Sequence, residues 1–411
     1  MNHLQRQLQQ KLDHRRRISK LRRLVINPTD GIDFSSNDFL GLSHSTLFKQ
    51  NLLNEMAKSS HVLGSTGSRL LDGNSAYCEW LERKIAQFHH SPAALIFNSG
   101  FDANTALFST LPQPGDIVLY DEFIHASVHE GMRLSRAEQC VPFRHSNVDD
   151  LERLLKRYTS NTSVKNHKNI FVALETVYSM DGDIAPLEKI VDLLKRFWPN
   201  RENGFIIVDE AHSTGVFGEK GRGIICELGL EQEIFARLHT FGKALASHGA
   251  VVLGSNTLRE YLINYARPLI YSTFMPFSTL ISIRCAYDLL EQGQTLHLQQ
   301  HVKELVERFR KKIELPVGTL LPSVTPIQGI VLNGNEAVRS LSKYLNENGC
   351  IVKPICSPTV PSGKERVRIC LHGHNTTEDL DKLINHIHSY FRERSSISSL
   401  PKAVNKKMSK L

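Results

Sequence analysis

Between residues 93 and 255, short apolar segments alternate with amphipathic stretches, and this alternation limits the possible folds more than any other feature of the sequence. The apolar segments predict strands at Ala94–Phe97, Ile117–Tyr120, Ile170–Leu174, Phe205–Val208 and Ala250–Leu253. Strands that alternate with helices form a mostly parallel sheet with helices on both faces. We therefore predict an α/β fold whose main part has three layers, α/β/α.

The rest of the chain divides around this alternating region. Residues 1–45 contain a polar helical segment and are predicted as an N-terminal arm, and residues 46–280 as the large domain. Helical patterns in residues 280–315 bridge to a smaller α+β part, so residues 281–393 are predicted as a C-terminal domain. Residues 394–411 are rich in Ser and Lys and are predicted as an exposed tail.

Positive charge is concentrated at the ends of the chain. Residues 1–25 hold eight Lys and Arg against one Asp, residues 401–411 hold four Lys, and the net charge is +8. Positive charge suits a nucleic acid, but it suits an anionic ligand such as a phosphorylated cofactor equally well. The charge by itself therefore identifies no partner.

Several features bear on the compartment. The seven cysteines form no Cys-x-x-Cys pair and most lie in apolar segments, which indicates buried free thiols in a reducing compartment. No apolar run approaches the roughly 18 residues of a membrane span, so we predict no membrane association. The basic segment Met1–Arg23 lacks the apolar region of a signal peptide, although a mitochondrial presequence stays an alternative there. The chain ends in Ser409-Lys410-Leu411, which the peroxisomal import receptor reads, so we predict a peroxisomal location, with the cytoplasm as the alternative.

Polar side chains follow the predicted strands where a ligand would lie, because ligands of open α/β sheets bind beyond the carboxyl ends of the strands. Gly100 and Phe101 lie between a strand and a helix, where backbone N–H groups favour an anion, although a plain glycine turn is the alternative. His125, Glu175 and Ser179 follow other strands. Each of these three residues is also compatible with a purely structural role.

Lys243 lies in a glycine-flanked loop, downstream of an apolar strand that ends in Asp209-Glu-Ala-His212. This layout is typical of enzymes that use pyridoxal phosphate, because the amine forms an imine with the cofactor and the carboxylate keeps the pyridine nitrogen protonated. The Asp-Glu-Ala-His sequence also occurs in helicases, but those need an earlier Gly-x-x-x-x-Gly-Lys-Ser/Thr loop, which this sequence lacks. We therefore exclude a helicase and predict no nucleic-acid partner.

Two arginines near the C-terminus alternate with apolar residues. Arg366 and Arg368 fall on one face of a predicted strand, and the intervening apolar residues fall on the other. An arginine that faces the ligand site would bind a substrate carboxylate through two parallel hydrogen bonds, whereas plain surface arginines are the alternative. His372 and His374 follow, but without a third ligand they predict no metal site.

Motifs of this chain form an ordered series over roughly residues 10–390. They are Asn37-Asp-Phe-Leu-Gly-Leu, Gly64-Ser-Thr-Gly-Ser-Arg, Ser99-Gly-Phe-x-Ala-Asn, His125-Ala-Ser, Ser179-Met-Asp-Gly-Asp, Asp209-Glu-Ala-His-Ser-Thr-Gly, Thr240-Phe-Gly-Lys-Ala, Tyr271-Ser-Thr and Thr359-Val-Pro followed by Arg-Val-Arg. In this order they resemble the α-oxoamine synthases. The resemblance implies a fold-type I pyridoxal-phosphate enzyme that condenses an amino acid with an acyl-CoA, releases carbon dioxide, and forms a homodimer with shared active sites.

The resemblance also implies roles for individual residues. Lys243 would link to the cofactor and then remove the α-proton of the substrate, Asp209 would pair with the pyridinium nitrogen, and His125 would stack on the ring. The catalytic candidates are thus Lys243, His125, Asp209 and His212, which also bind the cofactor. The other cofactor-binding candidates are Gly100, Phe101, Ser179, Thr240, Ser272 and Thr273, of which the last two would reach the phosphate in the other subunit. The substrate-binding candidates are Arg22, Asn37, Glu175, Thr359 and Arg368, with Arg368 as the predicted carboxylate clamp.

Within this family, the stretches Ser179-Met-Asp-Gly-Asp-Ile-Ala-Pro-Leu and Pro-Thr-Val-Pro most resemble the branch that joins L-alanine to a pimeloyl thioester such as pimeloyl-CoA. A branch that uses glycine and acetyl-CoA is the alternative. A catalytically silent partner subunit is a third interpretation, which the retention of all four catalytic candidates disfavours. Two residues near Lys243 depart from the family pattern: Ala246 replaces the usual glycine, and His248 replaces a small residue.

Overall fold

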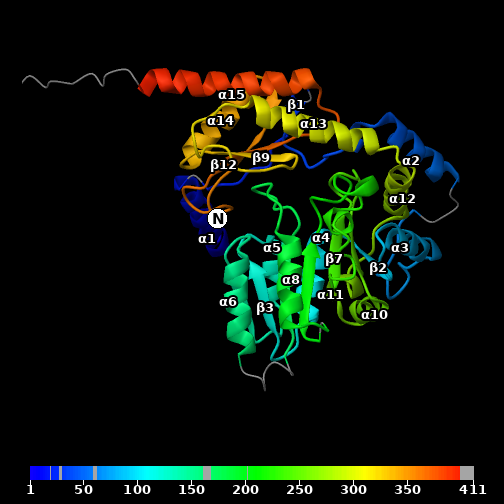
Figure 1. Ribbon diagram of the computed structural model, residues 1–411. Helices are drawn as coiled ribbons and strands as arrows, with labels where there is room; N and C mark the ends of the chain where they lie inside the picture. The colour runs from blue at the N-terminus through cyan, green and yellow to red at the C-terminus, as the bar shows by residue number, and fades with distance from the viewer. Residues whose placement is uncertain (19, 27–29, 59–62, 161–167, 201, 399–411) are drawn as a thin grey trace, which may run out of the picture.

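A seven-stranded sheet forms the centre of the protein in this computed structural model, which describes residues 1–18, 20–26, 30–58, 63–160, 168–200 and 202–398 (Figure 1). Its strands are β2 (Ala93–Phe97), β3 (Ile117–Asp121), β4 (Gln139–Phe143), β5 (Ile170–Glu175), β6 (Gly204–Asp209), β7 (Ala236–Thr240) and β8 (Ala250–Gly254). They lie in the order β2-β8-β7-β6-β5-β3-β4, and of these seven strands β8 alone runs in the direction opposite to the other six. The predicted, mostly parallel sheet is confirmed.

Helices cover both faces of this sheet. They are α3 (Ala76–Phe88), α4 (Gly100–Thr110), α5 (Ala126–Arg133), α6 (Val148–Thr159), α8 (Leu187–Phe197), α9 (Ile224–Glu227), α10 (Asn256–Tyr265) and α11 (Arg267–Ile270), with the short 3-10 helix η2 (Glu219–Gly221) before α9. Successive strand residues point to opposite faces. Ile96 and Val208 belong to one apolar cluster with α3, α6 and α8, whereas Leu95 and Ile207 belong to a second cluster with α4, α5 and α10. The three-layer α/β/α arrangement is therefore confirmed.

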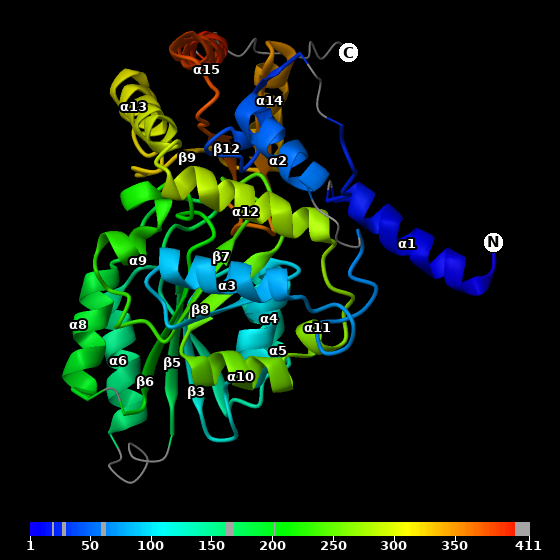
Figure 2. The same ribbon diagram turned by 90° about the vertical axis from the view of Figure 1, so that its right-hand side faces the viewer.

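A second, antiparallel sheet lies in the C-terminal part of the chain. Its strands, in spatial order, are β11 (Lys353–Ile355), β12 (Arg366–Cys370) and β9 (Ile327–Val331). Helix α14 (Asn335–Glu347) packs on this sheet, and α15 (Thr377–Ser398) packs on α14. Helices α12 (Phe277–Glu291) and α13 (Leu296–Lys312) connect the two sheets, as Figure 2 shows. The predicted smaller α+β part is thus present.

The N-terminal segment begins with α1 (His3–Arg17), a helix without buried residues that projects from the body of the protein (Figure 2). Strand β1 (Ile32–Asp33) then pairs in parallel with β10 (Cys350–Ile351), and Phe34 enters the core of the C-terminal part. The 3-10 helix η1 (Leu42–His44) and α2 (Thr46–Lys58) follow. The part around β1 is therefore anchored to the C-terminal part, where the Phe34 carbonyl also accepts from the backbone N–H of Cys370 in β12. The exact domain limits stay predictions.

The structure also bears on the predictions that the cysteines are free thiols and that no segment spans a membrane. All seven cysteines are free, and Cys78, Cys285, Cys350 and Cys370 are buried. Over the described ranges, no helix combines the length and the apolar character that a membrane span requires. The terminal signal Ser409–Leu411 lies outside the described residues.

Two strands of the large sheet, β4 and β7, are absent from the predicted set. In β7, Arg237 and His239 are buried, with only 2% and 0% of their surface exposed. A pattern based on apolar residues misses such a strand, because the side chains inside the sheet are polar and bond within the protein. Strand β4 lies at the edge of the sheet, contains Pro142, and is only partly buried.

Candidate active site

The carboxyl ends of five parallel strands meet at one edge of the large sheet. Gly100 follows β2, His125 follows β3, Glu175 ends β5, Asp209 ends β6, and Lys243 follows β7. The register confirms the alignment of two of them, because Glu175 lies directly opposite Asp209. The fold therefore gathers the main candidates from distant parts of the sequence.

Lys243 is held against His212. Its Nζ lies 2.8 Å from Nε2 of His212. Burial lowers the pKa of Lys243 to about 8, although the charges of Asp209 and Glu175 oppose this shift. Burial, together with the charge of Lys243, also lowers the pKa of His212 well below its ordinary value, so the imidazole is neutral. An amine with a lowered pKa beside a neutral imidazole suits a nucleophile and a base.

Asp209 is fixed by two hydrogen bonds. Its Oδ1 accepts from the backbone N–H of Ala211 at 2.9 Å, and its Oδ2 accepts from Nδ2 of Asn104 at 2.8 Å. The same Nδ2 donates to Oγ of Ser127 at 2.9 Å. Asn104 and Ser127 stand within the quoted motifs, but no pattern in the sequence indicates their roles, because only the fold brings helix α4 beside the end of β6.

His125 caps helix α5 and continues this network. Its Nδ1 accepts from the backbone N–H of Ser127 at 3.2 Å and lies 2.7 Å from the Ser127 Oγ. Because Nδ1 is an acceptor, the neutral ring carries its proton on Nε2. Surrounding protein atoms lower the pKa of His125, while the residue keeps an exposed face. An uncharged ring with an open face is suited to stacking on a flat cofactor.

Glu175 and Ser179 lie at and after the end of β5. Glu175 is 3% exposed, and its Oε1 has no hydrogen-bond partner within the described part of the chain. Burial, reinforced by the charge of Asp209, raises the pKa of Glu175 well above its ordinary range. Ser179 is partly buried in the following turn. Their contacts with substrate and cofactor stay predictions.

A cradle for a phosphate lies at the N-terminus of α4. A Cβ atom added to Gly100 would lie 2.7 Å from Cγ2 of Thr240, so only glycine allows this approach. The Thr240 Oγ1 is buried and unpartnered among the described residues. Phe101 presents its backbone in the first turn, although its side chain is 48% exposed. An anion at the helix N-terminus would complete the bonding of the Thr240 hydroxyl.

The two arginines of β12 differ in their partners. Arg366 forms an ion pair with Asp181. Arg368 is 8% exposed, donates from Nη2 to Oδ1 of Asn37 at 2.8 Å, and leaves its Nε unpartnered within the described chain. A buried guanidinium bound to a neutral amide suits a carboxylate ligand. The prediction that both arginines lie on one face of the strand is confirmed. Because Arg366 is paired with Asp181, it has a structural role, and Arg368 is the candidate carboxylate clamp.

Four other candidates lie outside this cluster. Arg22 is exposed in the segment after α1, and Thr359 is exposed beside a turn in which its backbone N–H donates to the Cys356 carbonyl. Tyr271 and Thr273 are exposed and Ser272 is partly buried, while the Thr273 carbonyl accepts from Asn98, just before the phosphate cradle. The structure of one chain brings none of these side chains into contact with Lys243, so their roles stay predictions.

Asp33 lies close to His372 and His374, so these three side chains bring together atoms that could bind a metal ion. However, Nδ1 of His372 contacts the Asp33 carbonyl at 3.0 Å and its Nε2 contacts Ser36 at 3.2 Å. Because both ring nitrogens are engaged, we assign no metal to this group.

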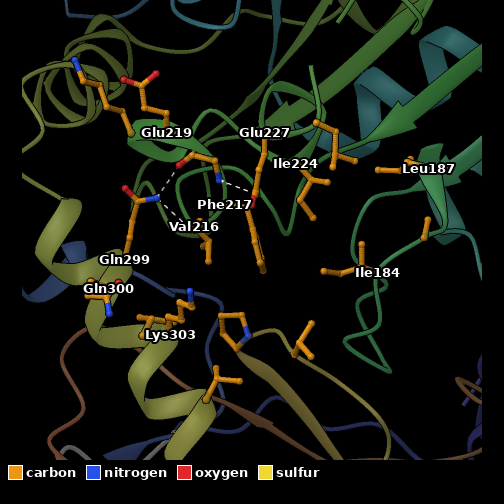
Figure 3. A pocket seen from close by; sticks show the side chains of 18 of the residues that line it. Ile184, Leu187, Val216, Phe217, Glu219, Ile224, Glu227, Gln299, Gln300 and Lys303 are labelled. Carbon is orange, nitrogen blue, oxygen red and sulfur yellow. Dashed lines mark hydrogen bonds between the residues drawn. The ribbon is translucent and has the colours of Figure 1, made fainter. Parts of the chain in front are cut away.

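A cavity of about 790 Å³ lies where α13 faces α8, η2 and α9 (Figure 3). Its lining includes Ile184, Leu187, Phe217 and Gln299, and none of the predicted site residues contributes to it. Gln299 closes one side, because its Nε2 donates to the Val216 carbonyl at 3.1 Å. This cavity is therefore separate from the candidate active site.

Known proteins are similar to this chain in both sequence and fold. Residues 29–387 match the family of class I and II aminotransferases. The 8-amino-7-oxononanoate synthase of Emericella nidulans is 48% identical over 389 residues, which cover 92% of this chain and 94% of that protein. The aminoacyl transferase sphA of Byssochlamys spectabilis is 36% identical and covers 98% of this chain and 91% of its own length. The crystal structure of 8-amino-7-oxononanoate synthase from Francisella tularensis is 30% identical, with a TM-score of 0.70 over 90% of this chain and all of that one.

The chain belongs to the class I and II aminotransferase family. Within this family it is a pyridoxal-phosphate-dependent acyltransferase of the α-oxoamine synthase type, so the predicted fold type, enzyme class and cofactor are confirmed. The site fits that cofactor: the unpartnered Thr240 hydroxyl and the close approach at Gly100 suit a phosphate, and Asp209 and Lys243 suit a pyridine nitrogen and an aldehyde.

Proposed function

We propose that this enzyme condenses L-alanine with pimeloyl-CoA, releases CoA and carbon dioxide, and forms 8-amino-7-oxononanoate for biotin biosynthesis. The 48% identity to a synthase of that name supports this pair of substrates. The observation that carries the amino-acid part is Arg368, a buried guanidinium with a free Nε whose charge acts on both Lys243 and His212. A carboxylate at Arg368 would place the amino acid next to the reactive amine.

The residues of this chain divide the chemical work. When bound, pyridoxal phosphate supplies a protonated ring that draws electrons away from the α-carbon of the amino acid. Asp209 would hold the proton at the ring nitrogen, because Asn104 and the Ala211 backbone keep its carboxylate in place. Lys243, with a pKa of about 8, is partly a free amine near neutral pH and accepts the α-proton at Nζ.

The remaining groups bind and orient. The first turn of α4 and the Thr240 hydroxyl would hold the phosphate. Arg368, oriented by Asn37, would hold the substrate carboxylate until it leaves as carbon dioxide. Neutral His212 keeps Nζ of Lys243 within hydrogen-bond reach of the site.

A direct assay of CoA release tests the substrates. Purified enzyme is supplied with alanine, glycine or serine against pimeloyl-, acetyl- or succinyl-CoA. We expect the highest kcat/KM for alanine with pimeloyl-CoA. Because a relative named aminoacyl transferase covers 98% of this chain, the pair needs this test, and a preference for glycine with acetyl-CoA would overturn it. No release with any pair would favour a silent subunit.

We also propose a homodimer with shared active sites. Large apolar side chains are exposed in three segments: Phe101 of the phosphate cradle by 48%, Tyr271 by 73% and Leu71 by 77%. Ser272 and Thr273 follow Tyr271 and would reach the phosphate in the other subunit. Light scattering should give a dimer for the wild type and a monomer for Leu71→Asp; a monomeric, fully active wild type would overturn the shared site.

We propose a peroxisomal location, read from the terminal Ser409-Lys410-Leu411. A tagged protein that keeps this terminus should appear in peroxisomes. Removal of the three residues should return it to the cytosol, and an unchanged punctate distribution after removal would contradict the proposal.

A further inference from the structure

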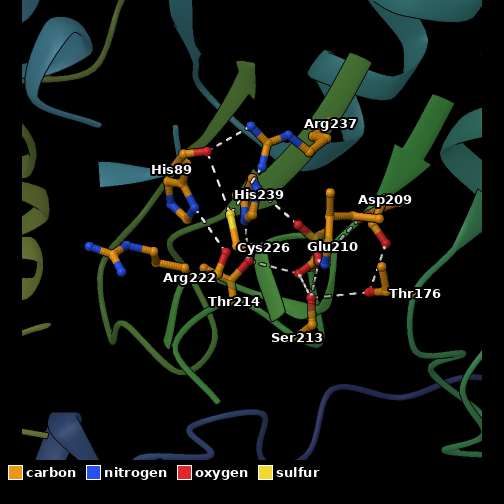
Figure 4. Close-up of polar contacts among 12 residues, drawn as sticks. His89, Thr176, Asp209, Glu210, Ser213, Thr214, Arg222, Cys226, Arg237 and His239 are labelled. Carbon is orange, nitrogen blue, oxygen red and sulfur yellow. Dashed lines mark hydrogen bonds and ion pairs between the residues drawn. The ribbon is translucent and has the colours of Figure 1, made fainter. Parts of the chain in front are cut away.

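Behind the candidate active site lies a pair of buried ionisable side chains to which the proposed reaction gives no role. Glu210 and His239 are both 0% exposed, and Oε2 of Glu210 lies 3.2 Å from Nε2 of His239 (Figure 4). Glu210 directly follows Asp209 at the end of β6, and His239 directly precedes Thr240 at the end of β7. The pair thus joins the two strand ends that carry cofactor-binding candidates.

The carboxyl group of Glu210 also holds the loop after His212. Its Oε1 accepts from Oγ of Ser213 at 2.9 Å and from the backbone N–H of Ile225 at 3.0 Å. A Cβ atom added to Gly223 would lie 2.7 Å from the same oxygen, and Gly223 has a φ of +99° that favours glycine. The segment from Ser213 to Ile225 is therefore folded around this single carboxyl group.

His239 is held from the other side. Its Nδ1 lies 2.9 Å from Oγ1 of Thr214, and its ring packs 4.1 Å from the ring of His89. Arg237, two residues earlier on β7, donates to the His89 carbonyl at 2.7 Å. Oε2 of Glu210 and Nε2 of His239 face each other at 3.2 Å without forming a hydrogen bond, and neither atom has another hydrogen-bond partner within the described part of the chain. Removal of one side chain would therefore leave the other buried atom without this neighbour.

The charges in this cluster are consistent with a fixed arrangement. Burial lowers the pKa of both His239 and His89 well below the ordinary value, so both rings are neutral. Burial raises the pKa of Glu210 to about 7, while the charge of Arg237 opposes that rise. The Thr214 hydroxyl donates to the Glu210 carbonyl at 2.7 Å, so Oγ1 accepts from Nδ1 of His239. A neutral His239 therefore carries its single N–H at Nδ1 and presents the lone pair of Nε2 to Glu210.

We propose that Glu210 and His239 are positioning residues for the cofactor, because their contact holds the end of β6, with Asp209, against the end of β7, which carries Thr240 and leads to Lys243. Neither side chain can touch the cofactor itself: His239 and Thr240 are consecutive on a strand and point to opposite faces. A displacement of about 1 Å at such a site can cost about a hundredfold in rate. The inference rests on the assignment of Asp209, Thr240 and Lys243 to the cofactor.

The test compares Glu210→Gln, whose amide keeps the polar contact with His239 and an acceptor for Ile225, with Glu210→Ala, which removes both. Glu219→Ala is the matched control, because Glu219 belongs to the same loop but its side chain is 74% exposed. Two quantities are measured: the dissociation constant of pyridoxal phosphate from the reconstituted apoenzyme, and the pH midpoint of the visible absorption of the Lys243-linked cofactor. Circular dichroism and the elution volume report folding.

Glu210→Ala should weaken cofactor binding by about tenfold or more and move the pH midpoint by about half a unit, whereas Glu210→Gln and Glu219→Ala should stay near the wild type. If Glu210→Ala does not fold, Thr214→Val replaces it, because this change keeps the volume but removes the hydroxyl that holds His239; about threefold weaker binding is then expected. A folded Glu210→Ala or Thr214→Val that matches the wild type in both quantities overturns the proposal. A wild type that binds no cofactor would instead refute the proposed function.

Discussion

His145 links two loops of the active-site edge, and its replacement should destabilise the enzyme in a pH-dependent way. Its Nδ1 lies 2.9 Å from Oδ1 of Asp121 and its Nε2 lies 2.8 Å from Oδ2 of Asp183. Asp121 ends β3, which leads to His125, and Asp183 lies in the turn after β5. Because both ring nitrogens face carboxylates, both donate, and the ring is an imidazolium.

The magnitude follows from the pKa. Burial alone would lower the pKa of His145, but the hydrogen bonds to Asp121 and Asp183 raise it from 6.5 to about 9. At about 1.4 kcal/mol per unit this corresponds to roughly 3 kcal/mol, and screening by solvent at the partly exposed ring reduces it to about 2 kcal/mol. Since the folded-state pKa is raised, this stabilisation is fully present below pH 6.5 and is lost as the pH rises through about 9.

Chemical denaturation of the wild type and His145→Gln measures the effect at fixed protein and cofactor concentrations. We expect the variant to be about 2 kcal/mol less stable at about pH 6, and the difference to shrink at about pH 10. The exposed His297 provides the control, because His297→Gln should change neither value. An equal loss of stability at both pH values would refute the assignment of a charged His145.

Three further predictions concern the site. Arg368→Lys should raise KM for the amino acid by about tenfold with little change in cofactor binding, since lysine lacks the planar fork, whereas equal kinetics would exclude Arg368 as the clamp. Asn104→Ala should weaken cofactor binding by about tenfold, measured by titration of the apoenzyme, because Asp209 loses its partner. Ala246→Val should lower the thermal stability by about 1–2 kcal/mol, because Ala246 has a φ of +45°, which a β-branched residue adopts poorly; an unchanged melting temperature would contradict this.

The sequence predicted the parts of the fold that rest on apolar pattern. It did not reveal β7, because Arg237 and His239 are buried there as a polar network, and only the tertiary partners Glu210 and His89 make that burial favourable. The residue pattern of a strand does not identify such partners, because they lie far away along the chain.

The site shows the same limit. The alternation of residue types placed Arg366 and Arg368 on one face of the strand. Only the structure shows that Arg366 pairs with Asp181, whereas the Nε of Arg368 has no partner within the described chain and can bind a ligand. Asn104 and Ser127 gained roles only when α4 and α5 packed against the end of β6. Ala246 replaces the glycine that is usual in the family. The structure explains that glycine, because residue 246 has a positive φ, a conformation that glycine adopts without strain.

The central claim is that Lys243 carries the cofactor. Borohydride reduction of the native protein, followed by digestion and peptide mass spectrometry, tests it directly, because reduction makes the link between lysine and cofactor permanent. We predict a single phosphopyridoxyl group on the peptide that contains Lys243 and its loss in Lys243→Ala. A label on another lysine, or an unlabelled Lys243 in protein saturated with pyridoxal phosphate, would contradict the account.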